Sequence, residues 1–252
     1  MVDVVEDAWI QTFSGQKLFL CHPDPKSILI GDIAHALSNQ CRFGGSCSSF
    51  YSVAQHCSLV YDLGLPVVEQ SLRRVKLAGT LSDFALIRQH QDSMLALLLH
   101  DAAEAYLGDI SRPLRTLLPK YNEIEANMIN VIFNVFGLHP YDSYKETIEL
   151  VDDLALKIEA QSLMPSKLLK EWGYDINDSA LLDIVPYTPE RARNAFLSRF
   201  NRVLSRRMSC PHIINVHTEA CPICTLSTLH EEEDTTCTAT FESDCPRIFK
   251  SK

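Results

Sequence analysis

Apolar residues recur every three or four positions along most of the chain, which is the spacing of amphipathic helices. One predicted helix begins at Asp32, which is placed to cap it, and a short element follows Ser111. The longer helices are predicted over residues 49–63, 81–107, 122–136, 144–164 and 189–206. Because strand signals are almost absent, the pattern predicts an all-α fold.

Three segments depart from this helical pattern. Residues 11–31 are typical of a short hairpin or extended arm, with a turn at Ser14 and Gly15. Residues 64–80 have mixed polarity and are interpreted as a connector or inserted segment. Residues 209–252 have no sustained period and are rich in Cys, Thr, Ser and Glu, which predicts a flexible tail. The expected organisation is an arm (1–31), one helical domain (32–208) and a tail (209–252).

Composition narrows the class of protein. The chain has 252 residues, 46% of them hydrophobic, and a net charge of −9, which argues against a duplex nucleic acid as partner. No apolar run approaches the ~20 residues of a membrane span, and the acidic first residues do not resemble a signal peptide. We therefore expect a cytoplasmic protein with no membrane contact, whose nine cysteines are reduced.

The segment LLLHDAAEAYLGD (97–109) carries the strongest chemical signal. A helix that is apolar through Leu99 suddenly presents His100, Asp101 and Glu104. An imidazole and a carboxylate there would bind a metal ion, and a second acid one turn away would hold a water on it. The ordinary interpretation, a polar helix face that begins at this point, has about even weight on spacing alone.

Two further positions favour the metal site. His56 lies on the apolar ridge of an earlier helix, and Asp152 interrupts another helix that is otherwise apolar around it. Taken singly, such a histidine is more often a hydrogen-bonded core residue and such an aspartate a surface charge. Together with His100 and Asp101 they would supply two imidazoles and two carboxylates from three helices, a plausible set for one divalent ion.

The order His56, His100-Asp101, Asp152 resembles the H…HD…D signature of the HD-domain metal-dependent phosphohydrolases. The similarity extends to five stretches over roughly residues 11–205, apart from 64–80: FSGQ, DIAHALSNQCRFGG, FYSVAQH, LLHDAAEAYLGDISRPLR and EAQSLM. These stretches resemble the bacterial and phage branch that includes 5′-deoxynucleotidases, to which phage dATP triphosphohydrolases are similar. The resemblance implies an HD-domain helical bundle.

The resemblance also implies a metal and catalytic set. The four signature residues would bind one divalent ion, and Asp152 is preferred over Asp153 because Glu159 then follows at the family's spacing. Glu104 would orient or deprotonate the attacking water, with Asp101 beside it. The ion itself, Mn, Co, Zn, Fe or Mg, stays open.

A substrate set follows from the same resemblance. Arg42 would grip the phosphate or sugar, Phe43 would disfavour a 2′-hydroxyl, and Asp109 would contact the deoxyribose. Arg112 and Arg115 would meet phosphate oxygens. The ordinary interpretations are solvated arginines and a core phenylalanine. Ser46 stands where the family often carries a histidine, which bears on substrate preference or rate rather than on the metal site.

The tail offers a separate metal-like pattern. Cys221 and Cys224 have the spacing of a zinc knuckle, and Cys210 with His212 would complete four ligands. A zinc ribbon normally has a second well-formed knuckle, which this chain lacks. A flexible tail is therefore the better interpretation of residues 209–252.

The leading functional hypothesis is hydrolysis at the 5′ phosphate of a small-molecule deoxynucleotide, from the monophosphate to deoxynucleoside and phosphate. The alternative is a triphosphohydrolase or pyrophosphohydrolase. The obvious cations for a longer phosphate chain are only Arg112, Arg115 and Lys120. Because a triphosphate would need several cations, the sequence favours the monophosphate. An alternative of another class is a non-catalytic nucleotide- or partner-binding module, but every signature residue is present. A homo-oligomer, dimeric or larger, stays open.

Overall fold

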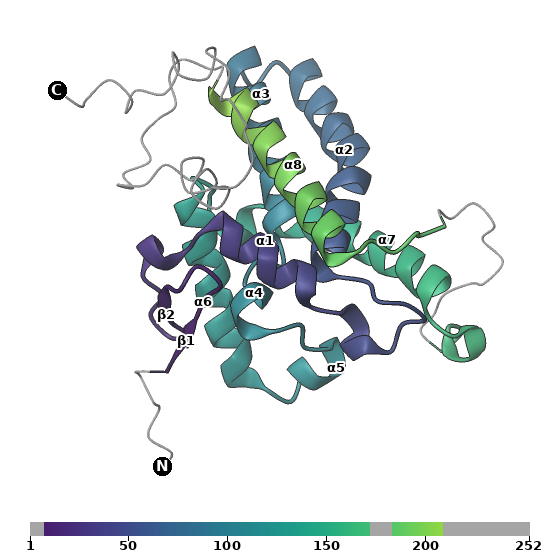
Figure 1. Cartoon of the computed structure of the whole chain (residues 1–252). Helices are drawn as coiled ribbons and strands as arrows, with labels where there is room; N and C mark the ends of the chain where they lie inside the picture. Colours follow the sequence, from purple (N-terminus) through teal and green to yellow (C-terminus); the bar gives the residue numbers. More distant parts are fainter. Residues whose placement is uncertain (1–7, 172–182, 209–252) are drawn as a thin grey trace, which may run out of the picture.

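The computed structural model describes residues 8–171 and 183–208, and confirms the predicted all-α class (Figure 1). The helices are α1 (Ile30–Asn39), α2 (Val53–Leu77), α3 (Asp83–Leu99), α4 (Glu104–Leu107), α5 (Arg112–Arg115), α6 (Pro119–Val135), α7 (Lys145–Leu163) and α8 (Pro189–Met208). Single 3-10 turns are η1 (Pro25–Ser27), η2 (Arg42–Gly45), η3 (Tyr141–Ser143) and η4 (Ser166–Leu168). Within these residues no helix is long and apolar enough to cross a membrane.

The expected N-terminal hairpin is also confirmed. β1 (Trp9–Gln11) pairs antiparallel with β2 (Lys17–Phe19), with Ile10 opposite Leu18. Gly15 has a φ of +85° in the connecting turn, a conformation that glycine adopts without steric cost.

Asp32 joins this hairpin to the first helix. The sequence predicted that Asp32 caps α1, but the N-cap is Leu29 and Asp32 lies in the first turn. Its carboxylate accepts hydrogen bonds from the Ser14 backbone N–H (2.8 Å) and the Ser14 hydroxyl (2.7 Å). With only 2% of its surface exposed, Asp32 serves a long-range contact rather than a helix end.

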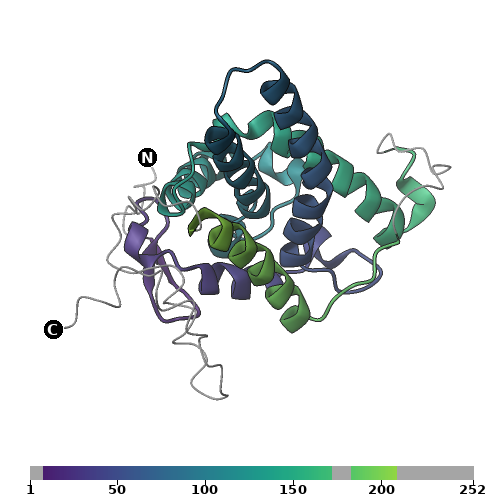
Figure 2. The ribbon, with the colours of Figure 1, turned by 90° about the horizontal axis from the view of Figure 1, so that it is seen from above.

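The core lies where α2 and α3 pack along each other and α8 crosses α1, α2 and α3 (Figures 1 and 2). Leu95 to Leu99 on α3 are at most 1% exposed, and each buried leucine contributes about 2 kcal/mol through the hydrophobic effect. Gly64 lets α2 approach closely, because a Cβ there would lie 2.3 Å from the Leu97 side chain. The two helices therefore have little freedom to slide past each other.

The predicted helix end at residue 63 is wrong, since α2 continues to Leu77 and most of residues 64–80, predicted as a connector or inserted segment, is helical. Gly64 and Pro66 suggested a break, because proline in a helix interior removes one hydrogen bond and crowds the preceding turn. Pro66 lies on the exposed side, however, while Val68 is 3% exposed. Tertiary packing of the inner face therefore outweighs the local cost of the proline.

The prediction of one helix over residues 81–107 is also wrong. α3 ends at Leu99, and α4 begins at Glu104. Between them, tight i to i+3 bonds run from Ala102 N–H to Leu99 O (2.9 Å) and from Glu104 N–H to Asp101 O (3.0 Å). The other long helices begin and end within a few residues of their predicted limits, as expected for helix ends. The predicted tail, 209–252, lies outside the described residues.

Replacing Asp32 with alanine is expected to lower the free energy of unfolding by about 2 kcal/mol, because two hydrogen bonds from Ser14 to a buried carboxylate are lost. Urea denaturation followed by circular dichroism measures this change. The control is Asp83→Ala, which removes an 80% exposed carboxylate from the first turn of α3 and should cost less than about 1 kcal/mol. Equal losses in the two variants would contradict the anchoring role of Asp32.

Candidate metal centre

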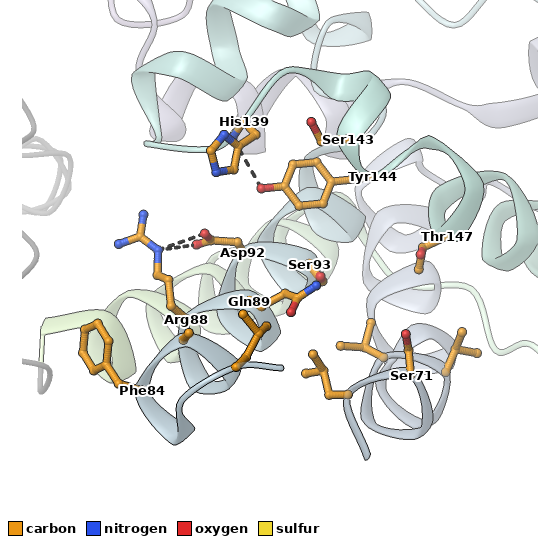
Figure 3. A pocket seen from close by; sticks show the side chains of 15 residues that line it. Ser71, Phe84, Arg88, Gln89, Asp92, Ser93, His139, Ser143, Tyr144 and Thr147 are labelled. Atoms are coloured by element: carbon orange, nitrogen blue, oxygen red, sulfur yellow. Dashed lines mark hydrogen bonds and ion pairs between the residues drawn. The ribbon is translucent and has the colours of Figure 1, made fainter. Parts of the chain in front are cut away.

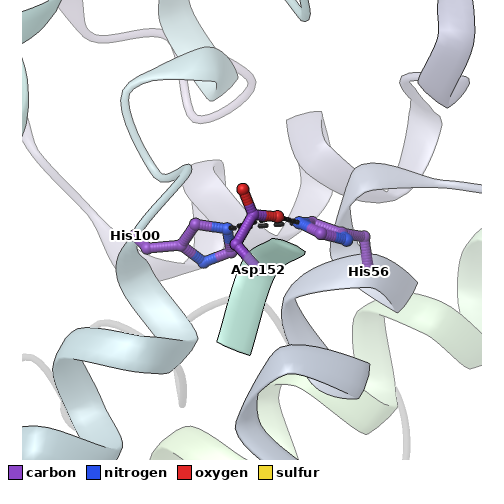
Figure 4. Close-up of side chains that lie close together, drawn as sticks. All are labelled: His56, His100 and Asp152. Carbon is purple, nitrogen blue, oxygen red and sulfur yellow. Dashed lines mark hydrogen bonds and ion pairs between the residues drawn. The ribbon is translucent and has the colours of Figure 1, made fainter. Parts of the chain in front are cut away.

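Three helices bring together two imidazoles and a carboxylate (Figure 4). His56 lies in the first turn of α2, His100 caps the C-terminus of α3, and Asp152 lies in the middle of α7. His56 Nε2 is 3.2 Å from both His100 Nε2 and Asp152 Oδ1, and the last two atoms are 4.0 Å apart. Donor atoms that share one ion at about 2.1 Å lie at such separations.

Asp101 completes the group from the turn after α3. Its Oδ2 lies 3.3 Å from His56 Nε2 and 3.2 Å from His100 Nε2. In an unbroken helix, adjacent residues point about 100° apart, but the tight turn at 100–103 lets His100 and Asp101 face the same point. The break that the sequence failed to predict is therefore part of how the site is built.

The donors present suit a divalent cation. Two neutral imidazoles and two carboxylates form a mixed nitrogen and oxygen set that several divalent metals accept. Two ring nitrogens that face each other at 3.2 Å need a proton or a cation between them. His56, His100, Asp101 and Asp152 therefore could hold one ion, as the sequence predicted; which ion is left open.

Both histidines are held with Nε2 towards this group. His56 Nδ1 donates to Glu159 Oε1 at 2.6 Å, and His100 Nδ1 donates to the Leu97 carbonyl at 2.9 Å. Glu159 is fully buried and also accepts a hydrogen bond from the Tyr51 hydroxyl at 2.9 Å. Such partners fix the tautomer and ring orientation of metal-binding histidines.

In the sequence, Glu159 was used only for its spacing from Asp152, and Tyr51 was not predicted to belong to the site. A weak signal was available for Glu159, because it follows Asp152 by two helical turns and lies between buried Ile158 and Ala160. Nothing in the sequence around Tyr51 indicated its contact.

The electrostatic field of the group keeps its carboxylates ionised. Burial raises the pKa of Asp101 and of Asp152, but the adjacent His100 and His56 outweigh burial and hold both pKa values below their usual range. For His56, burial and Arg42 lower the pKa, while Glu159, Asp101 and Asp152 together raise it well above its usual value. Without a cation, a proton on His56 thus balances the negative charge.

Glu104 lies beside the group in a different state. It is 4% exposed, and its Oε2 has no hydrogen-bond partner among the described residues. Burial, followed by the nearby Asp101 and Asp109, raises the pKa of Glu104 well above its usual value. Burial also raises the pKa of half-buried Asp109. A buried carboxyl with a raised pKa beside a cation site is typical of a proton carrier.

Arg42 lies inside the site rather than on its surface. Its guanidinium is 3.2 Å from Glu159 Oε2 and 3.6 Å from Asp101 Oδ2, and its side chain is 12% exposed. Phe43 is half-buried with its ring 5.4 Å from Arg42 Cζ. Phe43 has a φ of +58°, which is unfavourable for a residue with a side chain and is found more often at functional sites.

The other predicted cations are already engaged. Arg112 donates to Asp152 Oδ2 (2.7 Å) and to Asp153 Oδ1 (2.9 Å). It therefore contacts the site through the Asp152 carboxylate. Arg115 forms an ion pair with Glu125. Lys120 pairs with Glu123 on the surface.

A cavity of about 310 Å³ opens beside His100 and Asp101. It lies between α5, α6 and the start of α7, and Arg115, Tyr141 and Lys145 are among its lining residues. Tyr141 and Lys145 were not predicted from the sequence to lie near the site. Because His100 and Asp101 line this cavity, a small molecule in it would lie next to the metal group.

Other metal-like patterns are weaker. Cys57 Sγ lies within 4.8 Å of donor atoms of His100 and Asp101, but burial raises the pKa of this thiol and favours the protonated form. The described cysteines are free, as expected for reduced residues.

His35 stacks on Phe13, away from the group. Ser46 is exposed at the end of η2. The tail pattern of Cys210, His212, Cys221 and Cys224 lies outside the described residues.

The chain matches no protein-family model. It is 33% identical over 199 residues to the uncharacterized protein YfdR of Escherichia coli K12, which covers 77% of this chain and 94% of YfdR. It is 30% identical over 164 residues to the uncharacterized protein RCAP_rcc00048 of Rhodobacter capsulatus, which covers 62% of this chain and 73% of that protein. At this identity and coverage, the chain belongs to the same family as YfdR.

Proposed function

We propose that this protein is an HD-type metal-dependent phosphohydrolase that acts on the 5′ phosphate of deoxynucleotides and releases phosphate from the monophosphate. The observation that carries the proposal is the convergence of His56, His100, Asp101 and Asp152, in which each imidazole Nε2 lies within 4.0 Å of an oxygen of both aspartates, with the buried Glu104 beside them. The order of these residues along the chain is that of the HD signature.

The four ligands would hold a divalent ion, which would lower the pKa of water and neutralise charge on a phosphoryl oxygen. Glu104 would accept the proton of the attacking water, since its raised pKa gives the carboxylate a high affinity for protons. Glu159 would keep His56 Nε2 directed at the ion throughout. Arg42, held by Glu159, would place positive charge next to the phosphate.

The sugar would lie on the side of Arg42 and Phe43. Phe43 is held in an unfavourable backbone conformation beside the Arg42 guanidinium, so its ring has a defined place. A ring packed on C2′ would disfavour a 2′-hydroxyl, because that group would be buried without a partner. Asp109, half-buried near Arg42, would accept a hydrogen bond from the sugar.

Charge around the site supports a monophosphate over a triphosphate. Arg115 is paired with Glu125, and Lys145 shares the 310 Å³ cavity with Asp142. Arg112 is engaged by two aspartates. A triphosphate chain would need cations beyond the metal ion to balance its added charge, and the described cations near the site are compensated.

Substituting Asp152 with asparagine is expected to weaken Mn²⁺ binding by more than about 100-fold, because an anionic ligand is lost. The matched control is Asp153→Asn, the same change one residue along on a side chain that is 65% exposed. It should shift affinity by no more than about threefold, as a surface charge does. Isothermal titration calorimetry measures both, and the reverse order would assign the ligand to Asp153.

Replacing Glu104 with glutamine should reduce turnover by about 100-fold or more, because the proton acceptor is lost, while Mn²⁺ content stays unchanged. Phosphate release and metal analysis report the two quantities separately. Glu123→Gln, on the exposed face of α6, is the control and should keep full activity. Undiminished turnover in the Glu104 variant would remove it from the mechanism.

The substrate is tested with deoxy- and ribonucleoside mono- and triphosphates, assayed with several divalent ions and resolved by product chromatography. We expect phosphate from deoxynucleoside monophosphates. Release of triphosphate would instead identify a triphosphohydrolase, and no hydrolysis of any nucleotide would refute the proposal.

Phe43→Ala should narrow the preference for deoxy over ribo substrates, because the ring no longer crowds the 2′ position.

A further inference from the structure

A second, larger cavity lies away from the metal centre, with a volume of about 650 Å³ (Figure 3). It is enclosed by the C-terminal half of α2, by α3, and by the segment where η3 leads into α7. This volume is within the usual range for pockets that bind small molecules.

The cavity has an apolar and a polar wall. Val68 and Leu72 of α2, together with Phe84 of α3, form much of the apolar side. Arg88 and Tyr144 are on the polar side, and Figure 3 shows the Arg88 side chain directed towards Asp92. Polar residues form the larger part of the lining, and an apolar surface beside convergent polar groups is a common construction of a ligand site.

The polar wall and the arginine buried behind it together carry excess positive charge. Arg88 Nε donates to both oxygens of Asp92 at 2.8 and 2.9 Å, and Arg207 pairs with the same carboxylate from behind. Two guanidinium groups thus share one carboxylate. Burial lowers the pKa of Arg207 and the charge of Arg88 adds to this, while Arg207 Nε has no partner among the described residues.

Arg88 retains a donor for a ligand. Its Nη2 donates to the Gly137 carbonyl at 3.1 Å, but Nη1 makes no hydrogen bond within the described part of the chain. Arg88 is 26% exposed, so an anion can reach it from the cavity.

We propose that this cavity is an effector site for a small molecule with an apolar body and one anionic group. The body would pack against Phe84 and Leu72, and the anion would bind Arg88 and balance the second guanidinium. The inference uses the metal centre but not the proposed reaction, so it is tested without substrate.

The position of the cavity connects it to the metal centre. Its walls belong to α2, α3 and α7, and the same helices carry or end at His56, His100 and Asp152. Asp92 precedes His100 by roughly two turns of α3, or about 12 Å. A ligand in the cavity would contact every helix that supplies a metal ligand.

Binding is tested with two fluorescent probes that share one aromatic body, 8-anilinonaphthalene-1-sulfonate and the uncharged N-phenyl-1-naphthylamine. We expect the sulfonate to bind at one equivalent per full-length chain. Arg88→Gln should weaken the sulfonate about tenfold and leave the neutral probe unchanged, since only the charged hydrogen bond is lost. Phe84→Ser should weaken both probes, and the control Arg74→Gln, on the exposed face of α2, neither.

Arg88→Lys keeps the charge and should retain most of the sulfonate affinity, which guards against a folding defect in the glutamine variant. Equal sulfonate affinity in the native protein and Arg88→Gln would overturn the proposal, as would an equal loss for both probes. Sedimentation showing a dimer that Phe84→Ser dissociates would also overturn it, because a second copy would then cover the cavity.

Coupling is measured by titrating Mn²⁺ and following the free ion by electron paramagnetic resonance. Sulfonate probe at a concentration close to its native Kd should change the Mn²⁺ affinity by about two- to threefold in the native protein, and much less in Arg88→Gln, which is then largely unoccupied. An unchanged Mn²⁺ affinity in the native protein would overturn the effector role.

Discussion

The structure depends on an imbalance of buried charge. Asp101, Asp152, Glu104 and Glu159 converge from α4, from α7 and from the turn between α3 and α4, and Arg42 is enclosed among them. Asp101, Asp152 and Glu159 face one guanidinium, which leaves about two negative charges even before Glu104 is counted. Buried unpaired charge is costly, so such an arrangement is stable only when a cation or protons complete it. A divalent ion would restore neutrality, and its binding would displace the proton that His56 otherwise attracts.

The parts of this site that were predictable are those in which a polar residue interrupts a buried face. His100 and Asp101 directly follow the apolar run that ends at Leu99, and Asp152 follows Val151 on a largely buried face. Because a buried ionised group needs a partner, each of these positions implies a neighbouring charge, hydrogen-bond partner or ion. The helical period and the HD-like order of His56, His100, Asp101 and Asp152 then indicated which residues would be those partners. The all-α class followed from the same periodicity.

The parts that could not be predicted are contacts between atoms on different elements. Periodicity shows which face is buried, but it does not show that His56 Nδ1 meets Glu159 from 103 positions away. The turn at 100–103 was missed because no Gly or Pro marks it and Ala102 and Ala103 are good helix formers, so local propensity does not reveal the break. The continuation of α2 was missed because the cost of Pro66 is local, whereas the packing of Val68 that offsets it is tertiary.

The same packing suggests how a ligand in the larger cavity would affect the metal centre. α2 and α3 pack so closely at Gly64 and Leu97 that they have little freedom to move relative to each other. α7 lies across this pair, with Tyr144 and Thr147 at the larger cavity and Asp152 at the metal centre. Since a helix is stiff over these few turns, a shift of its N-terminal end would move the Asp152 carboxylate relative to the imidazoles on the other two helices. Metal affinity depends on that separation, so α7 is the element through which a ligand at one site would act on the other.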